Sequence, residues 1–142
     1  MRYFLLLLLA SFSFSTVAQN KDAIIGKWIN STAEAHIDIS KRNDKYYGKI
    51  VWIKDPKGTE STVKTDVKNP DPALRKRTIL GMEILKDFIY DDGKWTDGTI
   101  YDPKSGKVYS CVMSIKENGQ LNMRGYIGIS LIGRSETWKR VK

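Results

Sequence analysis

Apolar and polar residues alternate along most of the chain, which is the pattern of half-buried β-strands. In residues 34–40, alanine and isoleucine share one face, while His36 falls on the other face with charged and hydroxyl side chains. β-Branched and aromatic residues dominate residues 45–54 and 107–116, two further strand-like stretches. The pattern predicts about eight or nine strands.

Short turn sequences separate these stretches. Asp92-Gly93 and Asn118-Gly119 are the preferred two-residue hairpin loops, because both central positions need positive φ. Sequential hairpins favour an antiparallel meander, and closure of that meander removes its exposed edges. We therefore predict an all-β fold, a small antiparallel up-and-down barrel, with a β-sandwich as the competing arrangement.

One segment interrupts the alternation. Residues 55–72 contain three prolines and many polar side chains. Asp71 and Pro72 have the form of a helix N-cap and a first-turn proline, so a short helical turn is predicted after this long loop. Arg75 and Arg77 then have two interpretations. They are either solvated residues of a capped connector or ligands for an anionic group at the mouth of a barrel.

The beginning of the chain has the pattern of a signal peptide. Arg2 supplies a positive charge, an apolar run follows, and small residues precede a cleavage site after Ala18. The run is shorter than the roughly 20 residues of an ordinary membrane span. We interpret residues 1–18 as a signal peptide and residues 19–142 as one domain, exported to the periplasm or secreted. No transmembrane segment would remain after cleavage, and an uncleaved anchor is the alternative.

Composition narrows the classes of partner. The chain has a formal net charge of +8 and a single cysteine, Cys111, so packing without an internal disulfide must stabilise it. The basic residues are spread along the chain, and we predict no nucleic-acid partner for an exported protein of this kind. Loose attraction to anionic lipid or polysaccharide is compatible with the charge. The oligomeric state is not determined by the sequence.

The residues that could support catalysis form no recognisable constellation. His36 falls on a polar face and Cys111 on an apolar face, and no serine lies in a Gly-x-Ser-x-Gly sequence. Neither a calcium loop nor a zinc ligand set occurs. We predict no catalytic residue, metal or cofactor. A carboxylate pair such as Asp97 and Asp102 leaves glycoside hydrolysis open, although its spacing does not select it.

Aromatic and arginine side chains on the predicted strands are the stronger signal for a binding site. They either fill the barrel or line a ligand cavity, and the last strand mixes charges with a large ring. If that face is internal, its charges need partners: each other, water or a ligand. Internal and external placements fit the sequence equally well. The candidate ligand-binding residues are Trp52, Arg75, Arg77, Tyr101, Tyr109, Arg124, Tyr126 and Arg134.

Three longer stretches resemble one bacterial family. Residues 69–81, 98–110 and 124–141 are together similar to the family called domain of unknown function 2147, and the likeness covers essentially the whole mature chain. The resemblance implies an exported protein with a lipocalin-like barrel and transfers no catalytic residue. It also implies that Trp28 of the "GKW" sequence packs beneath an arginine of the closing strand, here Arg140.

Two functions follow from these observations. The first is an exported lipocalin-like barrel that binds a small apolar or amphipathic molecule in the cell envelope. The second is a filled barrel that acts as an envelope interaction or stress-related protein without a small ligand. A cavity with apolar walls would favour the first, and a contiguous exposed apolar patch would favour the second.

Overall fold

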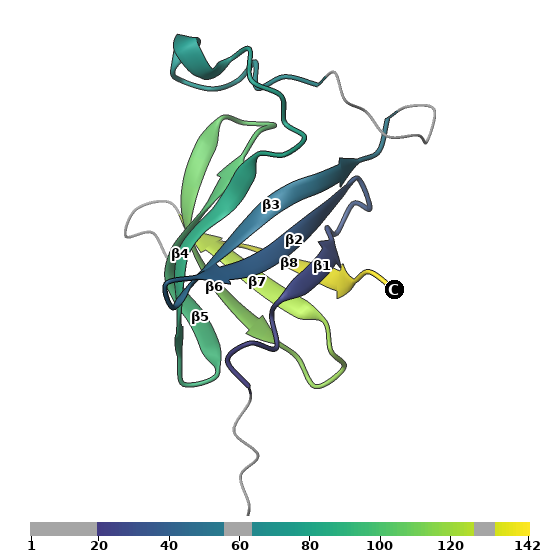
Figure 1. The fold of residues 1–142 in the computed structure, drawn as a ribbon, viewed down its shortest axis with the longest axis vertical. Helices are drawn as coiled ribbons and strands as arrows, with labels where there is room; N and C mark the ends of the chain where they lie inside the picture. The colour runs from purple at the N-terminus through teal and green to yellow at the C-terminus, as the bar shows by residue number, and fades with distance from the viewer. Residues whose placement is uncertain (1–19, 56–63, 127–132) are drawn as a thin grey trace, which may run out of the picture.

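The protein is a closed antiparallel barrel in which each strand pairs with its neighbour in sequence and the last pairs with the first (Figure 1). The computed structural model describes residues 20–55, 64–126 and 133–142, so the predicted signal peptide lies outside the described residues. The strands are β1 (Gly26–Ile29), β2 (Ala35–Arg42), β3 (Lys45–Ile53), β4 (Glu83–Asp91), β5 (Lys94–Asp102), β6 (Lys107–Ile115), β7 (Leu121–Tyr126) and β8 (Gly133–Arg140).

The predicted up-and-down barrel is confirmed, and the sandwich is excluded because the eight strands form a single closed sheet. The predicted helical turn is also present as a 3-10 helix, η1 (Pro72–Leu74). An oxygen of the Asp71 side chain accepts a hydrogen bond from the backbone N–H of Ala73 at 2.9 Å, as an N-cap does. Among the described residues, no helix is long and apolar enough to cross a membrane.

One end of the barrel is filled by large side chains. Aromatic residues of β1, β3, β4 and β5 meet there without solvent contact, and the backbone makes room for them. At Gly98 an added Cβ would lie only 2.3 Å from the ring of Phe88. The large and completely buried side chains at this end are Trp28, Tyr46, Leu85, Phe88, Trp95 and Leu121.

Residues 20–25 cross the same end and satisfy the polar atoms of its aromatic residues. The indole N–H groups of Trp28 and Trp95 donate to backbone carbonyls of this segment at 2.9 and 3.1 Å. The Tyr46 hydroxyl donates to the Asp22 carboxylate at 2.7 Å. These bonds satisfy polar atoms that would otherwise destabilise the interior, so this end of the barrel is closed.

The barrel closes through a short contact between β1 and β8. Only two residue pairs join the strands, one of them Trp28 with Arg140. The Arg140 guanidinium lies 4.1 Å from the centre of the Trp28 ring and donates to the carbonyls of Ala23 and Ile25 at 2.6 and 2.9 Å. The structure thus brings together the tryptophan and arginine of the first and last strands.

Candidate functional site

The opposite end of the barrel contains a cavity of about 660 Å³. Its volume lies within the range of about 300–1,000 Å³ that is typical of small-molecule sites. Most of the wall is apolar and comes from the inward positions of β2 to β8 and from the connection before β4. The apolar lining residues are Ala35, Ile37, Ile50, Ile53, Ile79, Ile84, Ile100, Cys111, Met123 and Trp138.

Side-chain size explains why this end is hollow. Most inward positions here carry isoleucine, methionine or cysteine, with Tyr109 and Trp138 as the larger exceptions, whereas the closed end carries mainly tryptophan, tyrosine and phenylalanine. Gly125 also faces the cavity, and a Cβ built there would meet its nearest atom, the Cβ of Tyr109, at an ordinary 3.5 Å. The barrel therefore encloses a packed core at one end and open volume at the other.

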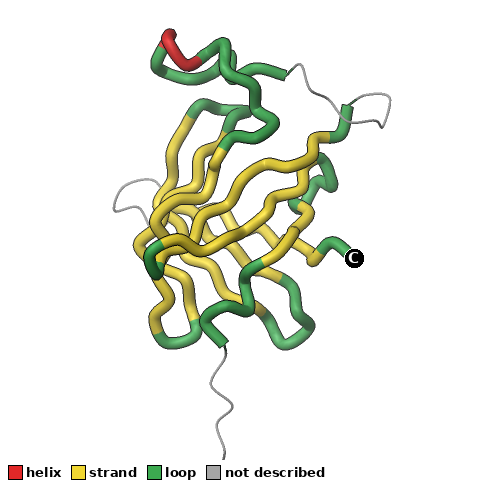
Figure 2. Tube along the Cα trace, viewed as in Figure 1, coloured by secondary structure: helices red, strands yellow, loops and turns green. Residues whose placement is uncertain are grey.

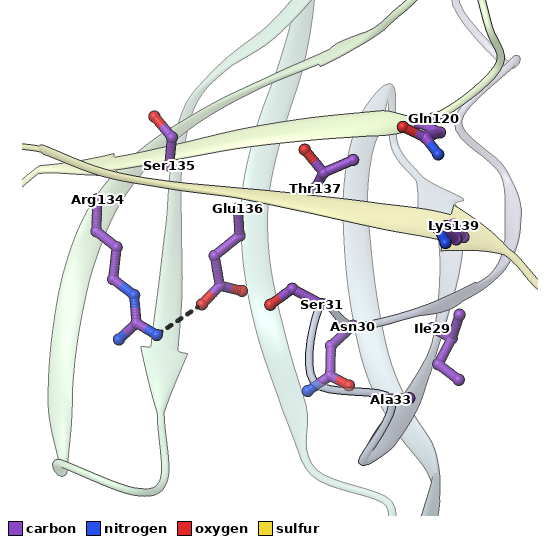
Figure 3. Close-up of a pocket in the computed structure, with 10 residues that line it drawn as sticks. All are labelled: Ile29, Asn30, Ser31, Ala33, Gln120, Arg134, Ser135, Glu136, Thr137 and Lys139. Carbon is purple, nitrogen blue, oxygen red and sulfur yellow. Dashed lines mark ion pairs between the residues drawn. The ribbon is translucent and has the colours of Figure 1, made fainter.

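Two charged side chains of β8 stand in the cavity wall. Arg134 and Glu136 form an ion pair of 3.1 Å between Nη2 and Oε1, seen in Figure 3 on the side of β8 that faces Asn30 and Ser31. The other Glu136 oxygen accepts a hydrogen bond from the Trp138 indole at 3.2 Å. Glu136 is mostly covered, while the Arg134 side chain is 76% exposed. A guanidinium has five N–H donors, so this arginine can bind a further acceptor at the opening.

A second hollow, of about 630 Å³, adjoins the cavity at the seam of the barrel (Figure 3). It lies between β8 and the turn from β1 to β2, and it shares Asn30, Ser31, Arg134 and Glu136 with the main cavity. β1 ends at Ile29, so the residues of β8 that precede Lys139 extend beyond its register. The cavity thus opens sideways as well as at its end.

An ion pair joins two parts of the rim. The Lys104 ammonium, in the turn from β5 to β6, donates to the Glu34 carboxylate just before β2. Hydrogen bonds from Lys104 and then from Thr32 lower the pKa of Glu34 below its ordinary value. Both partners of the pair line the cavity, so its opening is bordered by a contact that depends on charge.

Residues 64–80, which we call the mouth segment, lie at the open end of the barrel as a loop with one helical turn (Figure 2). The two limbs of the segment pair with each other through a β-bridge between Thr65 and Thr78. The Ile79 N–H also donates to the Lys64 carbonyl at 2.9 Å. The segment is therefore a hydrogen-bonded structure of its own.

A buried carboxylate fixes the mouth segment to β5. Asp66 is fully buried and accepts hydrogen bonds from the Tyr101 hydroxyl at 2.5 Å, the Asn69 amide at 2.8 Å and Nε of Arg77 at 3.1 Å. Burial alone would raise the pKa of Asp66, but these three hydrogen bonds outweigh it and lower the pKa below its ordinary value. The network keeps the carboxylate charged and the segment in place.

Three of the predicted ligand-binding residues lie in the cavity wall. These are Tyr101, Tyr109 and Arg134. Arg77 is instead engaged by Asp66, and Nε of Arg75 donates to the carbonyl of Asn69 at 2.7 Å within the mouth segment. The two arginines of this segment thus support its conformation and are not part of the cavity lining.

The other three candidates lie on the outside of the barrel. In β7, Met123 and Gly125 point inward, so the strand alternation places Arg124 and Tyr126 outside, with the guanidinium 5.5 Å from the tyrosine ring. Trp52 packs against His36 with ring centres 4.5 Å apart.

A β-bulge decides the position of Trp52. The register between β2 and β3 shifts between His36 and Ile37, which lets both Ile50 and Ile53 face inward. The intervening Trp52 therefore points outward.

The sequence analysis also did not select Gly125 or Ile84 as cavity residues. Gly125 lies two positions after Met123, so the alternation of β7 could have identified it. In β4 the neighbours Ile84 and Leu85 are both buried, and alternation does not choose between them.

Comparisons with known proteins agree with this architecture. A family model described as an uncharacterized protein conserved in bacteria (DUF2147) matches residues 26–140. The solved structure of protein HP1028 from Helicobacter pylori, described as belonging to the lipocalin family, is 26% identical in sequence. It matches with a TM-score of 0.71 over 83% of this chain and 82% of that chain. No curated protein matches. The predicted lipocalin-like fold is confirmed.

Proposed function

Because this chain belongs to the bacterial DUF2147 family, which has no assigned activity, we propose its function from the barrel itself: it binds a small apolar or amphipathic molecule in the cavity. The observation that carries the proposal is the volume of about 660 Å³ with a mostly apolar wall at one end of an otherwise packed barrel. Water in contact with such a wall is displaced favourably by an apolar ligand, at about 25 cal/mol per Å² of apolar surface buried.

The ion pair in the wall suggests how the ligand is oriented. The apolar body would lie against the isoleucines and Met123, and a polar or anionic group would lie at the opening beside Arg134. A planar guanidinium suits carboxylates and phosphates because it donates two parallel hydrogen bonds. Glu136 would hold the arginine in position in the empty and the occupied barrel.

The proposed place of action is the cell envelope. The signal-peptide pattern of residues 1–18 supports export, and the absence of a second cysteine makes the fold independent of disulfide formation after export. The alternative function, a filled barrel without a small ligand, is less well supported because the inward residues of the open end leave a cavity.

Native mass spectrometry tests the proposal directly. Mature protein purified from its own envelope should show a discrete added mass, and this mass should disappear after denaturation. Protein stripped in this way should then enhance the fluorescence of anilinonaphthalene sulfonate, an amphipathic anion. A clean protein mass together with no response to the probe would contradict the proposal.

A cavity-filling variant makes the test specific. Gly125→Phe places a ring in the cavity, and its Cβ starts in ordinary contact distance of its neighbours. We expect it to fold and to lose both the added mass and the probe response. The matched control is Val108→Phe, which adds the same kind of ring at a position that is 60% exposed on the outer wall. Equal binding by Gly125→Phe and the native chain would place the ligand elsewhere.

A further inference from the structure

We propose that the mouth segment docks the open end of the barrel onto a membrane surface that carries anionic lipids. This inference goes beyond ligand binding, because it rests on the exposed side chains of residues 64–80 and not on the interior of the cavity. Three features of that surface support it: its charge, its exposed apolar side chains and its position.

The charge of the segment is strongly positive on the outside. It contains five basic and two acidic residues. Both acids are engaged within the segment, because Asp66 is buried against Arg77 and Asp71 caps η1. Among the described residues, Lys68 and Lys76 have no ion-pair partner, and both are exposed. The basic residues are Lys64, Lys68, Arg75, Lys76 and Arg77.

Exposed apolar side chains accompany these charges. Of the four large hydrophobic residues that are exposed in the described part of the chain, two lie in the mouth segment: Val67 at 63% and Leu74 at 38%. A third, Val108 at 60%, stands opposite Tyr101, whose hydroxyl holds Asp66 of the same segment. Among the residues that the structure describes, three of the four exposed large hydrophobic side chains are thus at the open end, and the fourth, Ile25, belongs to the segment that crosses the closed end.

The segment is held in place before it meets a partner. Its two limbs pair through Thr65 and Thr78, and the Asp66 network fixes it to β5. The Lys68 carbonyl of the segment also packs closely on the turn between β5 and β6. A Cβ added at Gly106 in that turn would lie 2.0 Å from the carbonyl oxygen. Little conformational freedom remains to be lost on docking, which favours association.

The position of the segment gives the docking a direction. It lies at the open end of the barrel, opposite the segment that crosses the closed end (Figure 1). Lys64, Val67 and Lys68 belong both to the mouth segment and to the cavity lining. A membrane that binds this surface would therefore face the opening of the cavity, where a ligand of lipid origin could pass between bilayer and barrel.

The combination of side chains selects a lipid surface over other polyanions. Lysine and arginine attract the phosphates of anionic headgroups, at about 1 kcal/mol per residue near the surface, which is about fivefold in affinity. Valine and leucine beside them can enter the acyl boundary of a bilayer. A hydrated polysaccharide offers nothing for Val67 or Leu74 to enter, so these two residues distinguish the partners.

Vesicle co-sedimentation tests the charges. Protein stripped of bound molecules is mixed with vesicles of phosphatidylcholine alone, or of phosphatidylcholine and phosphatidylglycerol in equal parts. We expect binding to the anionic vesicles, weakened about fivefold for each charge removed in Lys68→Gln/Lys76→Gln. The matched control, Lys49→Gln/Lys94→Gln, removes the same charge from two exposed positions in β3 and next to the turn between β4 and β5. Equal loss in both pairs, or equal binding to both kinds of vesicle, would overturn the proposal.

A second variant tests the apolar contact without changing charge. Val67→Ser/Leu74→Ser should bind the anionic vesicles more weakly and should be retained normally on an immobilised sulfated polysaccharide. Val67→Ser alone serves the same purpose if the double variant loses its melting transition, since Val67 is mostly exposed. Unchanged vesicle binding by a folded serine variant would show that the surface recognises charge only, and this result would overturn the assignment of a lipid surface as the partner. Because Val67 and Lys68 also border the cavity, the cavity-filled variant Gly125→Phe separates docking from uptake of a vesicle lipid: it should bind the anionic vesicles as the native chain does.

Discussion

At the scale of single residues, two inward-facing glycines have opposite roles. Gly98 leaves room for the ring of Phe88 in the packed end, whereas Gly125 leaves open volume beside the cavity. Neither requires the left-handed backbone region, so the difference between them is one of space alone. A residue type that appears equivalent in the sequence therefore stabilises the fold at one position and creates a binding cavity at another.

This difference predicts the outcome of matched substitutions. Gly98→Ala should lower the free energy of unfolding by about 1–3 kcal/mol, because its Cβ would lie 2.3 Å from the Phe88 ring. Gly125→Ala should change it little, since its Cβ meets only ordinary contacts. Urea unfolding of the two variants measures the effect. Equal midpoints for the two variants would contradict this account of the packed end.

Cys111 gives a prediction of pH dependence at the same scale. Burial raises the pKa of its thiol from 9.0 to about 12. Between these values the unfolded chain has lost a proton that the folded protein keeps, so the free energy of unfolding falls by about 1.4 kcal/mol per pH unit. Below pH 9.0 the thiol keeps its proton in both the folded and the unfolded chain, so its contribution to stability is fully present.

The measurement compares the native chain with Cys111→Ala. Urea unfolding of both at a pH below 9.0 and at one between 9.0 and about 12 isolates the thiol, because other groups that titrate there are common to both. The native chain should lose more stability on alkalinisation than the variant. The thiol of the folded protein should also react slowly with thiol reagents, and reaction as fast as that of free cysteine would show that Cys111 is accessible.

At the scale of elements, the mouth segment depends on one buried carboxylate. Asp66→Asn removes the charge that binds Arg77 and weakens its bond from Tyr101, so the segment should open more easily, by about 1–3 kcal/mol of local free energy. Hydrogen exchange should accelerate in residues 64–80 and remain unchanged in the barrel strands. The same carboxylate makes the stability of the segment depend on pH. Because the pKa of Asp66 is lowered in the folded state, the stabilisation by its ionised form is present above pH 3.8. This stabilisation is lost as the pH falls through the folded pKa.

A neighbouring aspartate provides the control for this prediction. Asp71→Asn removes the same charge from the same segment, but asparagine caps a helix as well as aspartate does. Its exchange pattern should therefore resemble that of the native chain. Similar acceleration in both variants would indicate that net charge, and not the buried network, holds the segment.

At the scale of the whole molecule, the barrel has two unlike ends. The aromatic core and residues 20–25 close one end, and the cavity, the rim ion pair and the mouth segment form the other. A single sheet joins them, so the packed end provides the stability that lets the other remain hollow. In the proposed function, the binding end therefore needs little packing of its own.

The proposed export also belongs to this scale. Expressed in a bacterium with an envelope of two membranes, the chain should be recovered from the periplasm or the medium with Gln19 as its first residue. Intact-mass measurement and N-terminal sequencing check this. Deletion of residues 2–18 should retain the protein in the cytoplasm. A full-length chain found in the membrane fraction would support an uncleaved anchor instead.

The sequence by itself determined the strands and most of their turns, and it favoured a closed barrel over the sandwich that the structure then excluded. Alternation with period two marks a strand, and hairpin loops fix the order of neighbours, so both are local signals. The capped turn at Asp71 and Pro72 was equally local, because an N-cap acts within three residues.

The tertiary structure alone decided which faces point inward and how much space they leave. Alternation separates two faces of a strand but does not say which is internal, so Arg124 and Arg134 could not be told apart until β7 and β8 were paired. The bulge that turns Trp52 outward depends on register between strands. Cavity volume is the difference between the barrel's interior and the summed side chains that fill it, and no single segment contains that quantity.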